Sequence, residues 1–286
     1  MNGQVPITIQ FQYTGARDWG AMGMGYLMES ADEAKRLEMK TDASVVEAFA
    51  ARAGLRQGMR VVDIACGAGL TTSILGGMVG DSGSAVGLDS SPERIKEARD
   101  RHGDDRTSFV LRDFLKPLDG MGSFDFAWVR FALEYYKAEC FDVARNVSSL
   151  LAEGGILCLV DLDHNGLNHY GIPPRLEAAL VSAMRQMEEK ANFDPYAGRK
   201  LYSHLHKLGF RDIKVEAGAH HLIYGELGAV DEYNWGKKIE VISKRIAIDL
   251  PGYSGPEEFH DEFMAFFRDP GRFTYTPVIA AWGRKA

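Results

Sequence analysis

The sequence has few cysteines and no long apolar run, and each shortage argues against a class of protein. Its 286 residues include three cysteines, Cys66, Cys140 and Cys158, none in a paired metal-ligand spacing. A small, odd number of cysteines fits a reducing compartment better than a disulfide framework. No stretch reaches the roughly 18 consecutive apolar residues of a membrane span, and the first residues lack a secretory signal. We therefore expect a cytoplasmic protein with no membrane span.

An excess of basic residues is also missing. The chain carries 33 lysines and arginines against 40 aspartates and glutamates, a net charge of -7. Proteins that bind nucleic acid usually present a positive surface to the phosphates. We therefore expect no nucleic-acid partner.

Apolar strands alternate with helical patterns from residue 59 onward. The expected strands cover 59–65, 83–89, 107–113, 124–131, 156–163, 212–223 and 272–285. The expected helices cover 69–79, 91–102, 139–155, 174–191 and 199–209. The stretch 30–55 is expected to form one long helix or two short ones, the second capped by Asp42. Such alternation predicts an α/β fold in which helices cover both faces of a largely parallel sheet.

Acidic residues stand at the ends of four expected strands. They are Asp63, Asp89, Asp113 and Asp161. Because the carboxyl ends of parallel strands lie along one edge, and ligands of such sheets bind there, these acids predict a binding site at that edge.

The first of these acids opens the stretch VVDIACGAGL, a strand followed by a glycine turn and a helix. A dinucleotide fingerprint needs a third glycine where Thr72 stands, and a phosphate-binding P-loop needs a lysine where Leu70 stands. The turn therefore predicts a nucleotide-like ligand without either phosphate signature.

The run from Asp63 through Cys66 and Gly67 to Gly69 resembles the first motif of class I S-adenosylmethionine-dependent methyltransferases. The resemblance continues in order through VGLDSSPERIKEAR, LRDF, FDFAWVRFALEYY and LLAEGGILCLVD. It implies a Rossmann-like, doubly wound, seven-stranded sheet whose last strand is antiparallel, with a helical lid and a late helical insertion. The corresponding division is a lid segment 1–41, a core 42–224 with 271–286, and an insertion 225–270.

The resemblance also implies a donor site for S-adenosylmethionine, which leaves as S-adenosylhomocysteine. Asp89 would hold the ribose hydroxyls, and Asp113 with the Phe114 amide would meet the adenine. Asp63 would bond backbone amides of its own turn, and Arg130 would reach the donor carboxylate or the substrate. The full expected set is Asp63, Ala65, Cys66, Gly67, Gly69, Asp89, Ser90, Asp113, Phe114, Arg130 and Phe131.

The sequence says less about the molecule that accepts the methyl group. The stretch VRFALEYY has none of the prolines with which enzymes acting on the amines of DNA bases grip their target. We therefore expect a small, largely apolar acceptor with an oxygen, sulfur or nitrogen nucleophile, bound between the lid and the insertion by a monomer or homodimer. A same-fold transferase of another group, or a catalytically silent regulator, is the alternative.

Methyl transfer needs a base only when the nucleophile arrives protonated. The candidates are His164, His169 and Tyr135, and no metal is expected. His220 and His221 lie next to each other on an expected strand, so their side chains should point to opposite faces. In the insertion, Trp235 and Ile239 either pack on the core or line the acceptor pocket.

Overall fold

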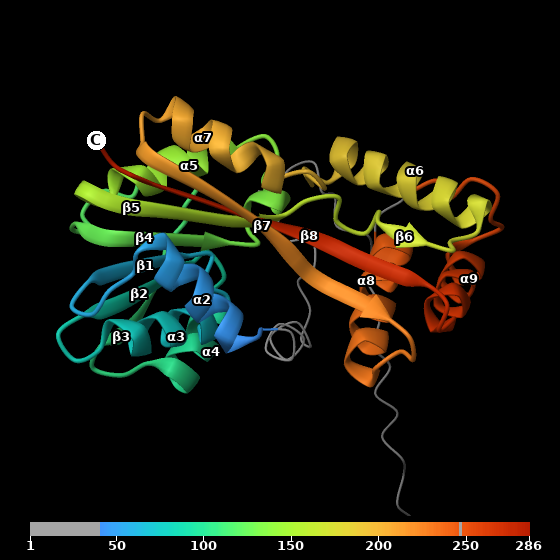
Figure 1. The fold of residues 1–286 in the computed structure, drawn as a ribbon, viewed down its shortest axis with the longest axis horizontal. Coiled ribbons are helices and arrows are strands. Elements are labelled where there is room, and N and C mark those ends of the chain that lie inside the picture. The colour runs from blue at the N-terminus through green and yellow to red at the C-terminus, as the bar shows by residue number, and fades with distance from the viewer. Residues whose placement is uncertain (1–40, 246–247) are drawn as a thin grey trace, which may run out of the picture.

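A computed structural model describes residues 41–245 and 248–286 (Figure 1). Its centre is a sheet in the order β3-β2-β1-β4-β5-β8-β6, with β7 paired to the outer side of β8. Five of its strands are mutually parallel: β1 (Arg60–Ile64), β2 (Ser84–Asp89), β3 (Thr107–Leu111), β4 (Phe124–Arg130) and β5 (Leu151–Leu162). The reversal of order between β1 and β4 is the switch point where doubly wound sheets bind ligands.

The far side of the sheet runs antiparallel. The last strand, β8 (Phe273–Arg284), is antiparallel to β5 and to the long edge strand β7 (Arg211–Tyr224). These strands confirm the predicted fold. An eighth strand, β6 (His169–Tyr170), was not predicted, because its two residues carry no periodic signal.

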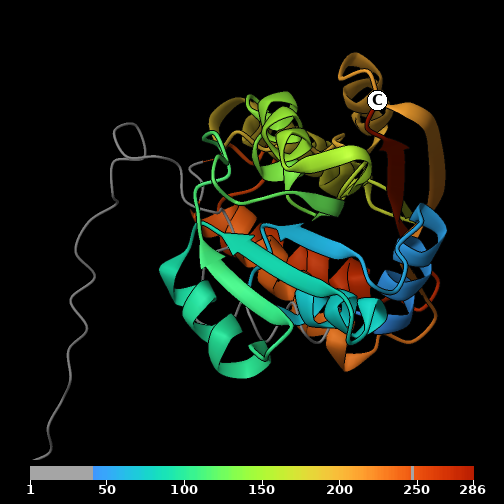
Figure 2. The same cartoon turned by 90° about the vertical axis from the view of Figure 1, so that its left-hand side faces the viewer.

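Helices cover both faces of the sheet (Figures 1 and 2). They are α2 (Ala43–Ala53), α3 (Leu70–Val79), α4 (Pro92–His102), α5 (Cys140–Ser149), α6 (Pro174–Lys190), α7 (Leu201–Lys207), α8 (Ala229–Arg245) and α9 (Pro256–Arg268). Two short turns of helix, η1 (Leu133–Tyr135) and η2 (Gly198–Lys200), follow β4 and precede α7. The Asp42 carboxylate caps α2 by accepting from the Ser44 amide, and Ser91 caps α4, as the sequence predicts.

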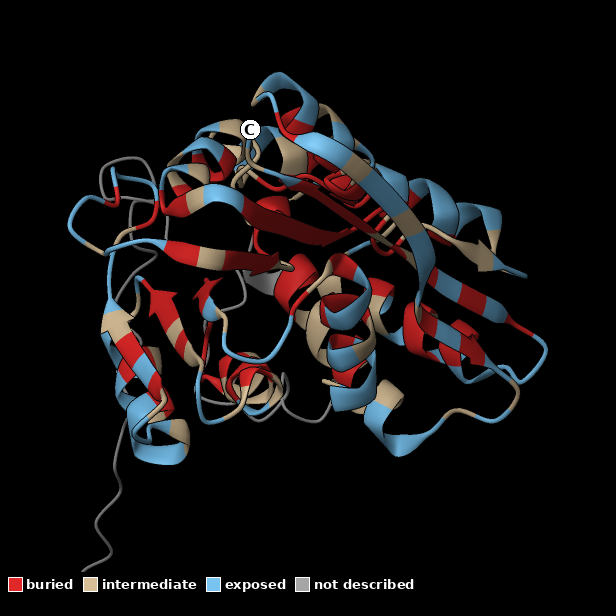
Figure 3. Ribbon diagram, turned by 60° about the vertical axis from the view of Figure 1, so that its left-hand side comes forward, coloured by how far each residue is buried: buried red, intermediate tan, exposed pale blue. Residues whose placement is uncertain are grey.

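Apolar side chains of the central strands form the core, and their buried residues are red in Figure 3. A third apolar cluster lies away from it, where α6, α8 and α9 pack together around the far end of β8. Within the described residues, no helix has the length and apolarity needed to cross a bilayer.

The helix predicted over 139–155 is wrong at its end. It stops at Ser149, and β5 begins at Leu151, with an irregular register against β4 that contains the glycine pair. Gly154 has a φ of 74°, a left-handed conformation that glycine adopts readily. The glycine pair therefore sits in a strand irregularity and does not end the helix.

The three-part division into lid, core and insertion stays a prediction. The proposed lid, 1–41, lies almost wholly outside the described residues. The proposed insertion, 225–270, contains α8 and α9, which pack against each other and against α6.

Candidate active site

The turn after β1 is built from residues in left-handed conformations. Ala65, Gly67 and Gly69 have φ values of 57°, 57° and 94°. A side chain at Gly69 would meet Phe109 and Ala98 at 2.8–2.9 Å, so this glycine lets the turn pack closely on the sheet. A Cβ on Gly67 would meet nothing within 4 Å. The turn therefore presents bare backbone to an open space.

Asp89 holds this turn in place. Its two carboxylate oxygens accept from the Gly67 amide and the Ser91 amide, both at 2.9 Å. Two hydrogen bonds leave a carboxylate with free lone pairs for a ligand. The prediction that Asp63 bonds the amides of its own turn is wrong. Asp63 accepts from the Thr72 hydroxyl at 2.6 Å, because its side chain points from β1 toward α3.

A half-buried arginine, Arg130, interacts electrostatically with Asp63. Burial raises the pKa of the Asp63 carboxyl to about 7, although the Thr72 hydroxyl and the Arg130 charge oppose the rise. Burial lowers the pKa of Arg130 to about 10, against the opposing effect of Asp63 and Asp161. The Arg130 guanidinium also lies over the Phe131 ring, 4.1 Å from its centroid. A cation is therefore held at the carboxyl ends of β1, β4 and β5.

Aromatic rings stand near the predicted ribose and adenine acids. The Phe114 and Tyr136 rings meet edge to face, with centroids 5.3 Å apart. Burial raises the pKa of Tyr136 to about 12, and the charges of Asp89 and Asp113 add to the rise. The Ser90 hydroxyl opposes the rise. Asp113 itself pairs with Lys116 and accepts from the Leu115 amide at 3.1 Å.

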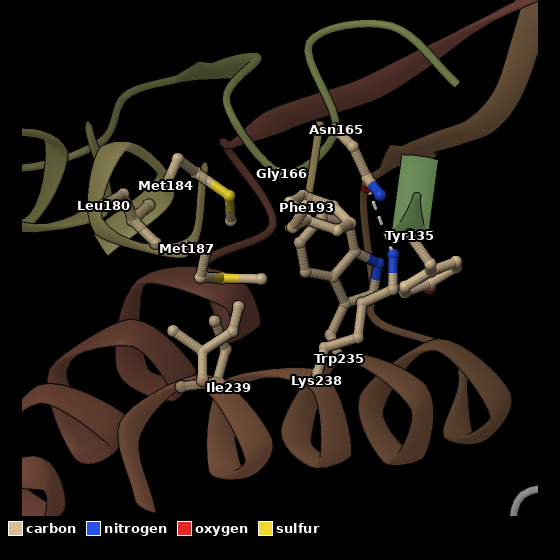
Figure 4. A pocket seen from close by; sticks show the side chains of 11 residues that line it. Tyr135, Asn165, Gly166, Leu180, Met184, Met187, Phe193, Trp235, Lys238 and Ile239 are labelled. Atoms are coloured by element: carbon tan, nitrogen blue, oxygen red, sulfur yellow. Dashed lines mark hydrogen bonds between the residues drawn. The ribbon is translucent and has the colours of Figure 1, made fainter. Parts of the chain in front are cut away.

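An apolar pocket opens beyond Tyr135 (Figure 4). Its lining residues are Tyr135, Asn165, Gly166, Leu180, Met184, Met187, Phe193, Trp235, Lys238, Ile239 and Ile242. They come from η1, the loop after β5, α6, the loop after α6 and α8. A mostly apolar lining with a few polar groups is typical of small-molecule sites.

The polar groups of the apolar pocket gather at one end. The Asn165 amide donates to Glu134 Oε2 at 2.7 Å, which turns its oxygen toward Lys238 Nζ, 3.4 Å away. Lys238 Nζ lies 5.0 Å from the Trp235 ring centroid. In Figure 4 this pair and the thioethers of Met184 and Met187 lie on opposite sides of the indole.

Comparison with known proteins decides the family. A profile described as "Methyltransferase domain" matches residues 55–223, more than half of the chain. The chain belongs to this methyltransferase family. The juvenile hormone acid O-methyltransferase of Bombyx mori is 26% identical over 223 residues, covering 74% of this chain and 73% of the relative.

Solved structures agree on the fold. The YcgJ protein from Bacillus subtilis superposes with a TM-score of 0.55 at 15% identity, covering 86% of this chain and all of that one. Phosphoethanolamine N-methyltransferase 2 of Haemonchus contortus, whose structure contains S-adenosylhomocysteine, gives 0.51 at 16% identity, covering 85% of this chain and 53% of that one. The enzyme is thus a methyltransferase that uses S-adenosylmethionine.

The donor-site residues fit that cofactor. The open space over the Gly67 backbone leaves room for the adenosyl and methionyl groups, since a Cβ there has no neighbour. Asp89 retains acceptor capacity for ribose hydroxyls, and the half-buried Arg130 matches a carboxylate in charge. Ala65, Cys66 and Phe131 belong to the same edge of the sheet. Their contacts with the cofactor stay predictions.

The structure separates the three candidate bases. Tyr135 lines the apolar pocket, whereas His164 lies beside Tyr196 with ring centroids 5.0 Å apart. His169 is packed among aromatic rings, and its two ring nitrogens bond Thr274 Oγ1 at 2.8 Å and the Gly166 carbonyl at 3.2 Å. Burial lowers the pKa of His169 to about 4. His169 is therefore neutral and already bonded, as a structural histidine would be.

The prediction that His220 and His221 point to opposite faces is wrong. The register of β7 against β8 shifts between Ala219 and His221, so a β-bulge interrupts the alternation. The two imidazole rings lie side by side with centroids 4.2 Å apart. His220 packs on Phe131 at 4.7 Å, and His221 on Trp235 at 5.7 Å.

Sequence reasoning missed several site residues. Tyr136 stands in the quoted run EYY, and its aromatic ring next to the fourth strand was the available signal. Asn165, Lys238 and Glu134 carried no signal, because residues 31 to 73 positions apart meet only in the folded chain. Trp235 and Ile239 were predicted either to pack or to line a pocket, and in the structure they are buried and line the apolar pocket.

Proposed function

We propose that the enzyme methylates a carboxylate oxygen of a small, largely apolar acid bound in the apolar pocket. The observation that carries this proposal is the polar end of the pocket, where the Lys238 ammonium lies beside the Trp235 indole. The Trp235 Nε1 hydrogen is buried and has no hydrogen-bond partner among the described residues. In Figure 4 the indole nitrogen is on the side of Lys238 and Asn165.

An unsatisfied buried donor costs about 1–3 kcal/mol, which a ligand oxygen would recover. A carboxylate suits this place because it only accepts hydrogen bonds and has two oxygens for two donors. The methionine, leucine and isoleucine side chains opposite would cover the rest of an apolar acid. Asn165, fixed by Glu134, turns its own acceptor oxygen to Lys238 and so helps hold the ammonium in position.

A carboxylic acid also explains why no histidine, aspartate or glutamate lines this pocket among the described residues. Its pKa near 4 leaves it ionised at neutral pH, so no proton has to be removed. His169 is bonded at both ring nitrogens, and His164 is not a lining residue. In this proposal His164 and His169 position the loop after β5, and Tyr135 lines the path between donor and acceptor.

S-adenosylmethionine, when bound, supplies a methyl group already activated by the positive charge on sulfur. The carboxylate oxygen forms the new bond to the methyl carbon while the sulfur–carbon bond breaks, its electron pair remaining on sulfur. The residues of this chain align the two partners and exclude water, and such alignment supplies much of the rate of an in-line displacement. The products are a methyl ester and S-adenosylhomocysteine.

The Bombyx mori relative supports this choice, because its name describes an O-methyltransferase that acts on an acid. A phenol, thiol or amine acceptor remains the competing class, and each of these would arrive at neutral pH largely protonated. Such an acceptor would need a base at the pocket.

The test uses compounds that share one apolar chain and differ only in the end group: a carboxylic acid, an alcohol, a thiol and an amine. With labelled S-adenosylmethionine, we expect methylation of the acid alone. Lys238→Met should raise the KM for the acid by about tenfold or more, on the scale of a charged hydrogen bond. Lys237→Met is the control, because Lys237 lies on the same helix, pairs with Glu240 and does not line the pocket. Turnover of the alcohol, thiol or amine without turnover of the acid would contradict the proposal.

A further inference from the structure

His220 lies about 90 positions from Phe131 in the sequence, yet the two rings pack at 4.7 Å. The bulge in β7 makes this contact, since regular alternation would turn His220 away from the face that His221 occupies. Bulges near active sites commonly redirect one side chain. His221 is fixed beside it by a bond between its Nδ1 and Thr276 Oγ1 at 3.2 Å.

Phe131 is itself in a constrained position. Its φ of 53° is unusual for a bulky residue, and its amide bonds the Val160 carbonyl at 2.9 Å. Such conformations persist only where surrounding contacts enforce them. The His220 ring is one of these contacts, and the Arg130 guanidinium, 4.1 Å from the centroid of the Phe131 ring, is another.

The contacts form a continuous series from the apolar pocket to the donor site. Trp235 packs on His221, and His221 packs on His220. His220 packs on Phe131, and the Arg130 guanidinium lies over the Phe131 ring. We propose that His220 is a positioning residue, which holds the Arg130 guanidinium in the donor site by packing on Phe131. This inference rests on the proposed role of Arg130 as a ligand of the cofactor carboxylate. It does not depend on the identity of the acceptor.

Calorimetric binding of S-adenosylhomocysteine tests the proposal, with thermal unfolding to verify that each variant is folded. Arg130→Met should weaken binding by about tenfold or more, and His220→Ala by about threefold to tenfold, the scale of an aromatic contact. His220→Phe should restore binding to within about twofold, because the flat ring is what the contact needs. His206→Ala is the control, since His206 stacks on Tyr202 at the surface.

The double variant shows whether His220 affects binding through Arg130 or independently of it. If His220 acts through Arg130, His220→Ala should change affinity by less than about twofold in the Arg130→Met background. If the fold-changes in affinity of the two single variants multiply in the double variant, the proposal is overturned. It is also overturned if Arg130→Met weakens binding while His220→Ala leaves it unchanged. Unchanged binding in Arg130→Met would instead remove the donor-site assignment, and this inference with it. His220→Leu, which keeps volume without a flat ring, replaces the Ala variant if that variant unfolds.

Discussion

Three residues at the carboxyl ends of neighbouring strands adopt left-handed conformations although none is glycine. Ala65 follows β1, Phe131 follows β4 and His164 follows β5, with φ values of 57°, 53° and 49°. Strained backbone tends to collect at functional sites, where surrounding contacts hold it. Left-handed backbone therefore lies at the same edge of the sheet as the charged residues of the donor site.

Asp63 should make stability depend on pH. Its carboxyl has a pKa of about 7 when folded, raised by burial from the ordinary value of 3.8. Between these values the folded chain keeps a proton that the unfolded chain has released, so a rising pH lowers the free energy of unfolding. We expect the Tm to fall between about pH 4 and pH 7, and to fall less in Asp63→Asn. Calorimetry that finds the same pH dependence in both proteins would show that this carboxyl is ionised throughout.

Asp89 should contribute mainly through its charge. Asp89→Asn keeps the size of the side chain and one acceptor oxygen for the Gly67 amide. We expect S-adenosylhomocysteine to bind about 10- to 100-fold more weakly, the scale of about 1.5–3 kcal/mol for charge-assisted hydrogen bonds. The control is Asp100→Asn, an exposed residue paired with Lys96 on α4. Unchanged affinity in a folded Asp89→Asn variant would show that Asp89 holds the turn and does not bind the cofactor.

At the scale of elements, the two glycines of the turn between β1 and α3 should have different roles. Gly67 should matter mainly for cofactor binding and Gly69 mainly for stability. Gly67→Ala places a methyl group in open space and Gly69→Ala places one against Phe109 and Ala98. Gly67→Ala should cost about 1–2 kcal/mol of stability for its left-handed backbone, but weaken S-adenosylhomocysteine binding at least about tenfold. Gly69→Ala should cost about 2–4 kcal/mol, because overpacking adds to the backbone term. Urea unfolding and calorimetry measure both, and the reverse ranking would contradict this division.

Sequence patterns correctly predicted the features that depend on neighbouring residues in the chain. The glycine turn, the caps at Asp42 and Ser91, and the acids at the strand ends each depend on a few adjacent residues. The bulge at His220 and the irregular start of β5 depend on register against a partner strand, which a single strand's sequence does not encode. For the same reason helix 139–155 was predicted too long.

At the scale of the whole molecule, the apolar pocket is a product of tertiary packing. α8 lies far in the sequence from α6 and from the loop after β5, and the three meet only in the folded chain. Asn165 and Lys238 are 73 positions apart, so no sequence window contained their pairing. The sequence therefore indicated a methyl donor site, whereas the apolar pocket is visible only in the folded chain.

The most direct measurement identifies the bond that the enzyme makes. The apolar acid is incubated with S-adenosylmethionine labelled in its methyl group, and the purified product is treated with mild alkali. A methyl ester releases its label as volatile methanol, whereas an ether, thioether or methylamine keeps it. The account predicts alkali-labile label with the wild-type enzyme and Lys237→Met, and a strong reduction with Lys238→Met. Label that stays in the product after alkali, or that Lys238→Met leaves unchanged, would contradict the account.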